Sequence, residues 1–111
     1  MATDTLPRLV YVPCPGLDVA RKLARALVEA RLAACVNIVP GIVSVYRWKD
    51  AVEEDEEVLL LAKTTETRAA AAVALLDRLH PYEVPAITVL DATGASAGTL
   101  AWLAAETGPG G

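Results

Sequence analysis

The feature that most constrains the fold is a very long strand-like segment near the middle of the chain. It reads "CVNIVPGIVSVYRW", residues 35–48, and is rich in the β-branched and aromatic residues that favour extended strands. At about 3.3 Å per residue it would extend roughly 45 Å, against about 20 Å for a typical strand. Pro40 and Gly41 predict a bulge or bend inside it. A chain of 111 residues cannot cover such a strand, so we expect its far end to project.

The next segment completes a hairpin with this strand. After a short "KDA" connection comes "VEEDEEVLLLAKT", residues 52–64, whose second half is a near-continuous apolar strand. The acidic run at residues 53–57 is typical of a solvated hairpin arm that discourages wrong edge pairing, although carboxylate oxygens also attract hard divalent cations. Arg47 and Lys49 could pair with these acids, within the hairpin or across subunits.

The remaining patterns predict four further elements and short flexible ends. Apolar residues at three- and four-residue steps indicate amphipathic helices, and prolines mark where elements stop. In chain order we predict a buried strand over 8–14, a helix from 18 to 34, a second helix that begins after Thr64 or Thr65 and ends at His80 before Pro81, a strand over 84–93, and a short helix around 100–104. We expect one domain over 8–106, with flexible ends at 1–7 and 107–111.

This order of elements favours an α+β, ferredoxin-like fold. With right-handed crossovers, a βαββαβ chain interleaves most simply as a four-stranded antiparallel sheet in the order 4-1-3-2, with both long helices on one face. A short C-terminal helix follows. The long second strand then lies at an exposed edge, which is an aggregation hazard unless another copy of the chain pairs with it.

In this topology Cys14, His80 and Glu83 come to one rim of the sheet, although Cys14 lies far from the other two in sequence. A thiolate, an imidazole and a carboxylate suit copper or zinc, and the helix after Cys14 would stabilise the thiolate. A structural interpretation stays open, with a buried thiol, a histidine at a helix end and a solvated glutamate. Cys35 begins a strand expected to face the helices, so we predict it in the core.

Composition excludes several classes of protein. A net charge of −4 weighs against nucleic acid as a partner, because duplex binding depends on Lys and Arg. No apolar stretch approaches the roughly 20 residues that span a bilayer, and the beginning of the chain lacks signal-peptide features, so we expect a cytoplasmic protein without a membrane partner. Neither a nucleophile elbow nor a glycine-rich phosphate loop is present, so we expect no enzyme and no organic cofactor.

Several long motifs resemble the CutA divalent-cation tolerance family. They are "RLAACVNIVPGIVSVYRW", "EVLLLAKTT", "LHPYEVPAI" and "LAWL", and together they cover nearly the whole chain from Leu9 to Trp102. The resemblance implies a ferredoxin-like subunit, a tight homotrimer joined through its long hairpins, copper or other divalent-metal binding in some members, and an architecture similar to the PII signalling trimers.

Three residues depart from the family's pattern. Ala86 stands where many members carry a glutamate, which removes one candidate carboxylate ligand. Thr99 replaces a tyrosine before the terminal Leu-x-Trp, and Asp50 replaces a glycine at the hairpin turn. The departures bear on the metal prediction more than on the fold.

Taken with the resemblance, the sequence predicts a trimeric divalent-cation tolerance protein that binds Cu(II) or another divalent cation at Cys14, His80 and Glu83. The alternative is a non-catalytic, PII-like signalling or scaffold trimer that binds a small molecule or a partner protein in its inter-subunit clefts. Aromatic residues favour both interfaces and such clefts. The candidate cleft or interface residues are Tyr46, Arg47, Trp48, Tyr82 and Trp102.

Overall fold

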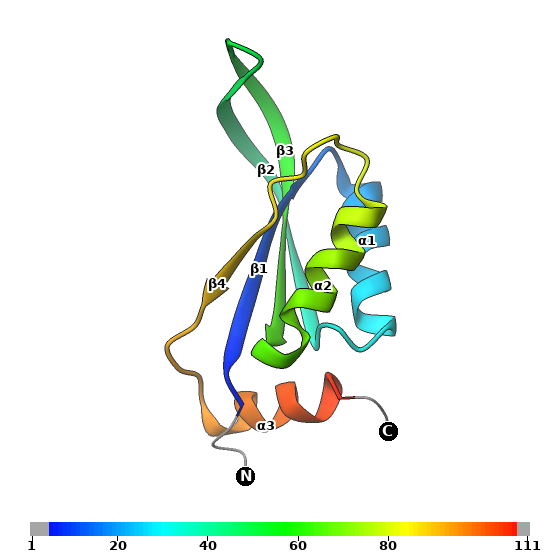
Figure 1. Cartoon of the computed structure of the whole chain (residues 1–111), viewed down its shortest axis with the longest axis vertical. Helices are drawn as coiled ribbons and strands as arrows, with labels where there is room; N and C mark the ends of the chain where they lie inside the picture. Colours follow the sequence, from blue (N-terminus) through cyan, green and yellow to red (C-terminus); the bar gives the residue numbers. More distant parts are fainter. Residues whose placement is uncertain (1–4, 109–111) are drawn as a thin grey trace.

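A computed structural model describes residues 5–108 and confirms the ferredoxin-like prediction. Four strands form one antiparallel sheet in the order β2-β3-β1-β4, which is the predicted order. The third helix crosses below the other elements (Figure 1). The elements are β1 (Pro7–Cys14), α1 (Leu17–Glu29), β2 (Cys35–Trp48), β3 (Ala51–Thr65), α2 (Glu66–Leu79), β4 (Thr88–Asp91) and α3 (Ala97–Glu106).

The core lies between one face of the sheet and helices α1 and α2, which cover the same side (Figure 1). Alternate residues of β1, Val10 and Val12, point into it and are fully buried. Leu23 and Leu27 of α1 and Leu76 of α2 meet them there. Burying each of these leucines contributes roughly 1.5–3 kcal/mol to the stability of the fold. The apolar stripe of each helix therefore predicts which side packs on the sheet.

The opposite face of the sheet is apolar but has no covering layer within residues 5–108. The register places one apolar set on this side, because side chains alternate along a strand. Leu59 lies on this side between Pro13 and Val39 and is only 9% exposed. The other apolar side chains, which we call the open face, are half-buried or exposed; they are Leu9, Tyr11, Val39, Leu61 and Leu90.

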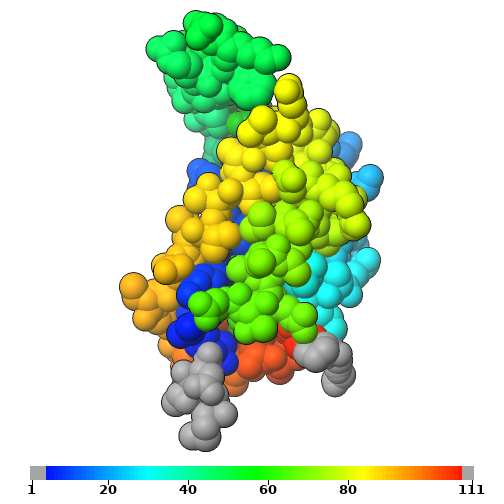
Figure 2. Space-filling model, viewed as in Figure 1, coloured from blue at the N-terminus to red at the C-terminus, as the bar shows by residue number. Residues whose placement is uncertain are grey.

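The β2–β3 hairpin projects from the body, as its length predicted (Figures 1 and 2). The molecule measures 49 × 25 × 21 Å, and the hairpin forms one end of its long axis. A register shift between Val39 and Ile42 confirms the predicted bulge, and Gly41 takes a positive φ of 81° there, which suits a residue without Cβ. The projecting arm therefore begins where the regular register is interrupted.

Three details of the predicted elements are wrong. The first helix ends at Glu29 rather than at residue 34, and Arg31 beyond it takes a positive φ of 60°. Cys35 is partly exposed rather than in the core, because the neighbouring Val36 packs on the helix side and directs Cys35 to the open face. The fourth strand spans only Thr88–Asp91 instead of 84–93. Pro85 has no backbone N–H for a sheet, and its carbonyl accepts a local hydrogen bond from Ile87 N at 2.9 Å.

The start of α2 and the chain ends refine the predicted boundaries. Thr65 is the N-cap of α2 without a side-chain cap hydrogen bond, whereas the Thr64 hydroxyl donates to the carbonyl of Leu32 at 2.7 Å. Of the ends predicted as flexible, residues 1–4 and 109–111 lie outside the described residues. Among the described residues, Pro7 opens β1, and Thr107 is only 3% exposed.

Two arginines hold the end of α3 against the body. Arg31 follows α1 and donates from Nε to the carbonyl of Gly108 at 2.8 Å and from Nη2 to that of Ala105 at 2.7 Å. Arg68 of α2 donates from Nε to the carbonyl of Thr107 at 2.6 Å. Cations at a helix C-terminus satisfy carbonyls that have no partner within the helix. The predicted terminal helix is thus fixed by contacts that hydrophobic periodicity does not reveal.

Candidate functional site

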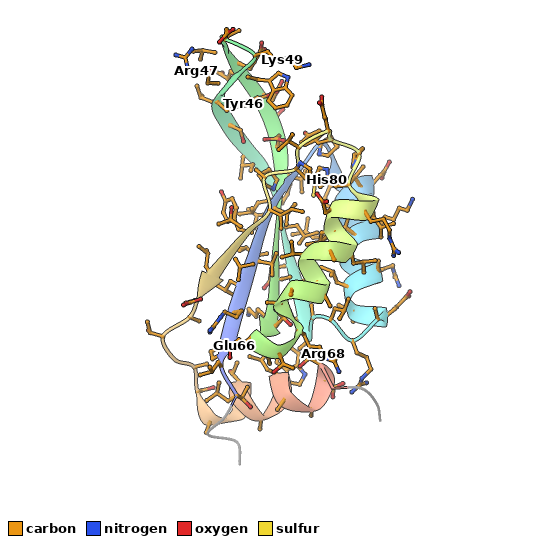
Figure 3. All side chains as sticks on the ribbon, in the orientation of Figure 1. Tyr46, Arg47, Lys49, Glu66, Arg68 and His80 are labelled. Atoms are coloured by element: carbon orange, nitrogen blue, oxygen red, sulfur yellow. The ribbon has the colours of Figure 1, made fainter. Side chains whose placement is uncertain are left out.

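His80 occupies the rim predicted for it, where β1 and α2 both end (Figure 3). It is the C-cap of α2 and takes an extended conformation, as expected for a residue before a proline. The side chain is buried, with Nε2 2.9 Å from the carbonyl oxygen of Pro13. Tyr82 N–H donates to Nδ1 at 3.2 Å, so the proton of the neutral ring is on Nε2 and is donated to Pro13. Both ring nitrogens are therefore occupied.

Cys14 reaches the same rim but is sealed from solvent. It is fully buried at the end of β1, and its thiol makes only a weak contact to the carbonyl of Val12 at 3.7 Å. Burial, together with the nearby Glu57 carboxylate, raises the pKa of the thiol from 9.0 to about 11. Since the thiolate is the form that binds soft metals, Cys14 is a poor metal ligand at neutral pH in this subunit.

Glu57, which was predicted to belong to a solvated hairpin arm, is buried at this rim. It is 7% exposed, and its Oε2 accepts a hydrogen bond from the Tyr82 hydroxyl at 2.7 Å. Burial and this carboxylate raise the pKa of Tyr82 well above its usual value. The Tyr82 ring also stands 4.7 Å from that of His80. The signal for Glu57 is its position as the last acid before the apolar half of β3.

Glu83 lies at the rim but turns toward the hairpin. Its Oε1 is 4.0 Å from Lys49 Nζ, and both side chains are exposed, so the pair contributes little to stability. Lys49 also lies 5.5 Å from the ring centroid of Trp48. Within one subunit, Lys49 thus pairs with Glu83 rather than with the acidic run. Within residues 5–108, Arg47 makes no ion pair or side-chain hydrogen bond.

The hairpin arm carries a second contact between a tyrosine and an acid. The Tyr46 hydroxyl donates to Asp55 Oδ2, and this hydrogen bond is the main reason why the pKa of Tyr46 rises to about 12. Tyr46, Trp48 and Tyr82 thus lie toward the hairpin end of the molecule. Trp102 lies on α3 at the other end, so one subunit does not bring it to the rim (Figure 1).

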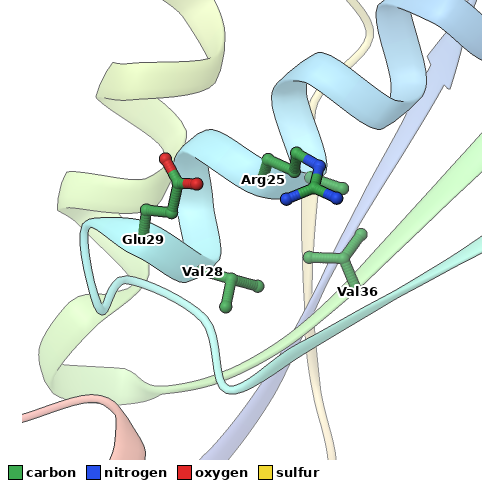
Figure 4. A pocket seen from close by; sticks show the side chains of 5 residues that line it. Arg25, Val28, Glu29 and Val36 are labelled. Carbon is green, nitrogen blue, oxygen red and sulfur yellow. The ribbon is translucent and has the colours of Figure 1, made fainter.

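The predicted ligands share a rim without converging on a metal-sized space. Within residues 5–108, no group of three or more His, Cys, Asp or Glu side chains is arranged to hold a metal ion. A buried neutral thiol, an imidazole with both nitrogens bonded and a carboxylate facing Lys49 do not fit a copper ion as one ligand set. One hollow of about 210 Å³ lies elsewhere, between α1 and β2 (Figure 4), and is lined by Ala24, Arg25, Val28, Glu29 and Val36.

The sequence is similar to a family of known proteins over most of its length. The family described as "CutA1 divalent ion tolerance protein" matches residues 8–106. The "Divalent-cation tolerance protein CutA" of Thermus thermophilus is 47% identical over 103 residues, which cover 93% of this chain and all of that protein. The human "Protein CutA" is 43% identical over 93 residues, which cover 84% of this chain and 52% of that longer protein.

Solved structures agree with the sequence relatives. The solved structure of the Thermus thermophilus protein superposes with a TM-score of 0.88 at 47% identity, and the match covers 92% of this chain and 99% of that one. The CutA1 structure from Ehrlichia chaffeensis superposes with a TM-score of 0.89 at 31% identity and covers 95% and 98%. In the described part of the chain, none of the helices is long and apolar enough to cross a membrane.

Proposed function

Because the chain belongs to the CutA1 divalent ion tolerance family, we propose that it acts in divalent-cation tolerance as a homotrimer joined through its β2–β3 hairpins. The family and relative names specify tolerance and no reaction, so we propose a role without catalysis. The cytoplasm is the compartment that we propose, since its reducing conditions suit the free Cys14 and Cys35. Relatives elsewhere are described as chloroplastic and periplasmic.

The main support for the proposed trimer is the apolar surface that one subunit leaves uncovered. On the hairpin, Val43, Val45 and Val52 are each more than 60% exposed, on an arm that has no layer packed against it. The open face adds a second apolar region on the side away from the helices. Val43 and Val45 lie opposite Glu56 and Glu54, so the hairpin offers exposed apolar side chains bordered by charge, as interaction surfaces often do. Hairpins that pack against the open faces of sister subunits would bury both regions.

Strand pairing supports the same assembly. β2 is 14 residues long and is an edge strand, which within residues 5–108 pairs with β3 alone. A long edge leaves backbone N–H and C=O groups without partners, and another strand can satisfy them. Pairing of this edge with a neighbouring subunit would also cover an arm that has little covering of its own.

Copper binding at Cys14, His80 and Glu83 remains a prediction, which the geometry of one subunit does not favour. The test is calorimetric titration of Cu(II) into the wild type and into His80→Ala. If His80 binds the ion, the variant loses heat and affinity. Glu106→Gln, an exposed glutamate on α3, is the control and should titrate like the wild type. Equal affinity in the wild type and in His80→Ala would remove His80 from any copper site.

The proposed role in tolerance is tested in a copper-sensitive bacterial host that lacks its own CutA. Expression of the wild-type chain is expected to raise the copper concentration at which the cells grow. Val43→Lys, placed on the proposed interface, should lose this effect, whereas Leu79→Lys on the exposed side of α2 should keep it. No gain in growth with the wild type at matched expression would contradict the proposal.

The scaffold alternative draws support from the polar cluster beside the hairpin. Two tyrosine–carboxylate hydrogen bonds, Tyr82 to Glu57 and Tyr46 to Asp55, place phenols and acids close to exposed aromatic surface. A cleft between subunits with these groups would suit a small molecule with polar and aromatic parts. Thermal-shift screening separates the two functions: stabilisation by metal alone supports the first, and stabilisation by an organic ligand supports the second.

A further inference from the structure

A second hollow lies at the end of the molecule opposite the hairpin, below the first turn of α2. Its volume is about 230 Å³, and it is bordered by the segment before β1, the start of α2 and the end of α3. Figure 3 shows Arg68 at this end of the molecule, close to α3. The polar side chains that line it belong to Thr5, Thr65, Thr67, Arg68 and Thr107.

The side chain of Thr65, unpaired in the described part of the chain, suggests that the hollow binds a ligand. The residue is 7% exposed and lines the hollow, yet within residues 5–108 its hydroxyl makes no hydrogen bond. As the N-cap of a helix, a threonine ordinarily uses its hydroxyl to accept a bond from an amide of the first turn. Here that bond is not made, so both the hydroxyl and the amides remain available to another group.

The hydrogen-bond donors around Thr65 favour an anion as the ligand. The first amides of a helix have no intrahelical acceptor, and of these the amide of Glu66 bonds to Leu6 O at 2.9 Å, which leaves those of Thr67 and Arg68. Arg68 adds a guanidinium whose Nε is fixed by the Thr107 carbonyl at 2.6 Å, while its two Nη groups have no partner within residues 5–108. The partial positive charge at the N-terminus of α2 acts in the same direction. The C-terminus of α3, which has the opposite partial charge, also borders the hollow, and Arg31 and Arg68 donate to its carbonyls.

Glu66, which carries the carboxylate in the first turn of α2, does not line the hollow. Its Oε2 lies 3.5 Å from Arg8 Nη2, and its side chain is 61% exposed. Arg8 also pairs with Asp91 at 3.1 Å, which keeps both acids at the sheet edge.

We infer that this hollow is a binding site for a phosphate group, held by the Thr65 hydroxyl, the amides of Thr67 and Arg68, and the Arg68 guanidinium. Amides at a helix N-terminus combined with an arginine fork are the usual donors to phosphate oxygens. The group belongs to free phosphate or to a small phosphomonoester. The site lies away from the hairpin and from His80, so it uses none of the residues proposed for copper.

The test is a titration of the full-length chain with inorganic phosphate and, separately, with methyl phosphate, followed by amide NMR at constant ionic strength. Saturable shifts at the amides of Thr67 and Arg68 are expected. Thr65→Val keeps the shape of the side chain and should weaken binding about tenfold, since hydrogen bonds to charged groups are worth that much. Arg68→Gln should weaken it at least as much. Arg78→Gln, at the other end of the same helix, is the control and should bind as the wild type does.

The two ligands also identify the source of the group. Equal or tighter binding of methyl phosphate supports a phosphomonoester, whereas binding of inorganic phosphate alone supports the free anion. Because the Thr65 hydroxyl has no partner in residues 5–108, Thr65→Val should have the melting temperature of the wild type. This variant therefore tests the site even if Arg68→Gln loosens the packing of α3. Shifts that do not saturate with either ligand, or unchanged phosphate affinity in Thr65→Val, would overturn the inference.

Discussion

The Tyr82 hydroxyl donates a hydrogen bond of 2.7 Å to Glu57 Oε2, which joins the loop after α2 to the base of the hairpin. Glu57 is buried and makes no ion pair within residues 5–108, so this hydrogen bond offsets part of the cost of removing a carboxylate from water. The contact fixes where the hairpin leaves the body. The proposed trimer depends on that direction, because the arm must reach a neighbouring subunit.

Removing the Tyr82 hydroxyl should destabilise the subunit. Tyr82→Phe leaves a buried carboxylate without a donor and is expected to lower the free energy of unfolding by about 1–3 kcal/mol. Urea denaturation at fixed protein concentration measures it. Tyr46→Phe is the matched control, since Tyr46 also donates to a carboxylate but does so in solvent, and it should change stability little. Equal effects of the two substitutions would contradict the assigned role of burial.

Cys14 should make stability fall at alkaline pH. Its pKa is about 11 in the folded chain and about 9.0 when exposed, so the unfolded chain loses the thiol proton first. The contribution is fully present below pH 9 and is lost as the pH rises from 9 to 11.

Comparison with Cys14→Ala isolates this effect, because tyrosines and lysines titrate in both proteins. We expect the wild type to lose stability relative to the variant between pH 9 and 11 in urea denaturation. A constant difference over that range would show that the thiol is not shielded from water as the structure has it.

The hairpin turn carries strain that a glycine would relieve. Lys49 and Asp50 have φ values of 50° and 69°, in the left-handed region that costs most residues roughly 1–2 kcal/mol. Asp50→Gly should therefore stabilise the protein by about 1 kcal/mol, as judged by thermal unfolding. Asp50→Ala keeps the Cβ and should not stabilise it. The position also explains why a glycine is common there in the family that the sequence resembles.

A charge on the hairpin should disrupt the assembly. Val43→Lys puts an ammonium group on a side chain that is 63% exposed in one subunit and buried in the proposed trimer. Sedimentation velocity should show monomers for Val43→Lys and the wild-type species for Leu79→Lys. If both variants sediment as the wild type does, Val43 lies outside any interface.

The fold was largely predictable because its signals are local and periodic. The 14-residue strand from Cys35, the proline after His80 and the helical spacing of Leu23 and Leu27 each determine one element, and right-handed crossovers leave one simple arrangement. Cys35 was misplaced because a shift of one residue along a strand reverses the face, and the sequence alone did not fix that register.

The site was harder to predict because proximity at a rim is not the same as coordination. Topology alone brought Cys14, His80 and Glu83 to one end of the sheet. Whether the thiol ionises, and which atoms bond His80, depends on burial and on backbone carbonyls that carry no sequence signature. The sequence did not predict Glu57 as a rim residue, because it ends a run of acids that are exposed. Only the packing of Tyr82 distinguishes it from them.

The most direct test of the central claim is the mass of the wild-type protein in solution, measured by light scattering on a size-exclusion column over a range of concentrations. We predict a single species of three times the 11.7 kDa subunit mass. A species of 11.7 kDa that persists at every concentration would mean that the open face and the hairpin stay exposed, and it would contradict the proposed homotrimer.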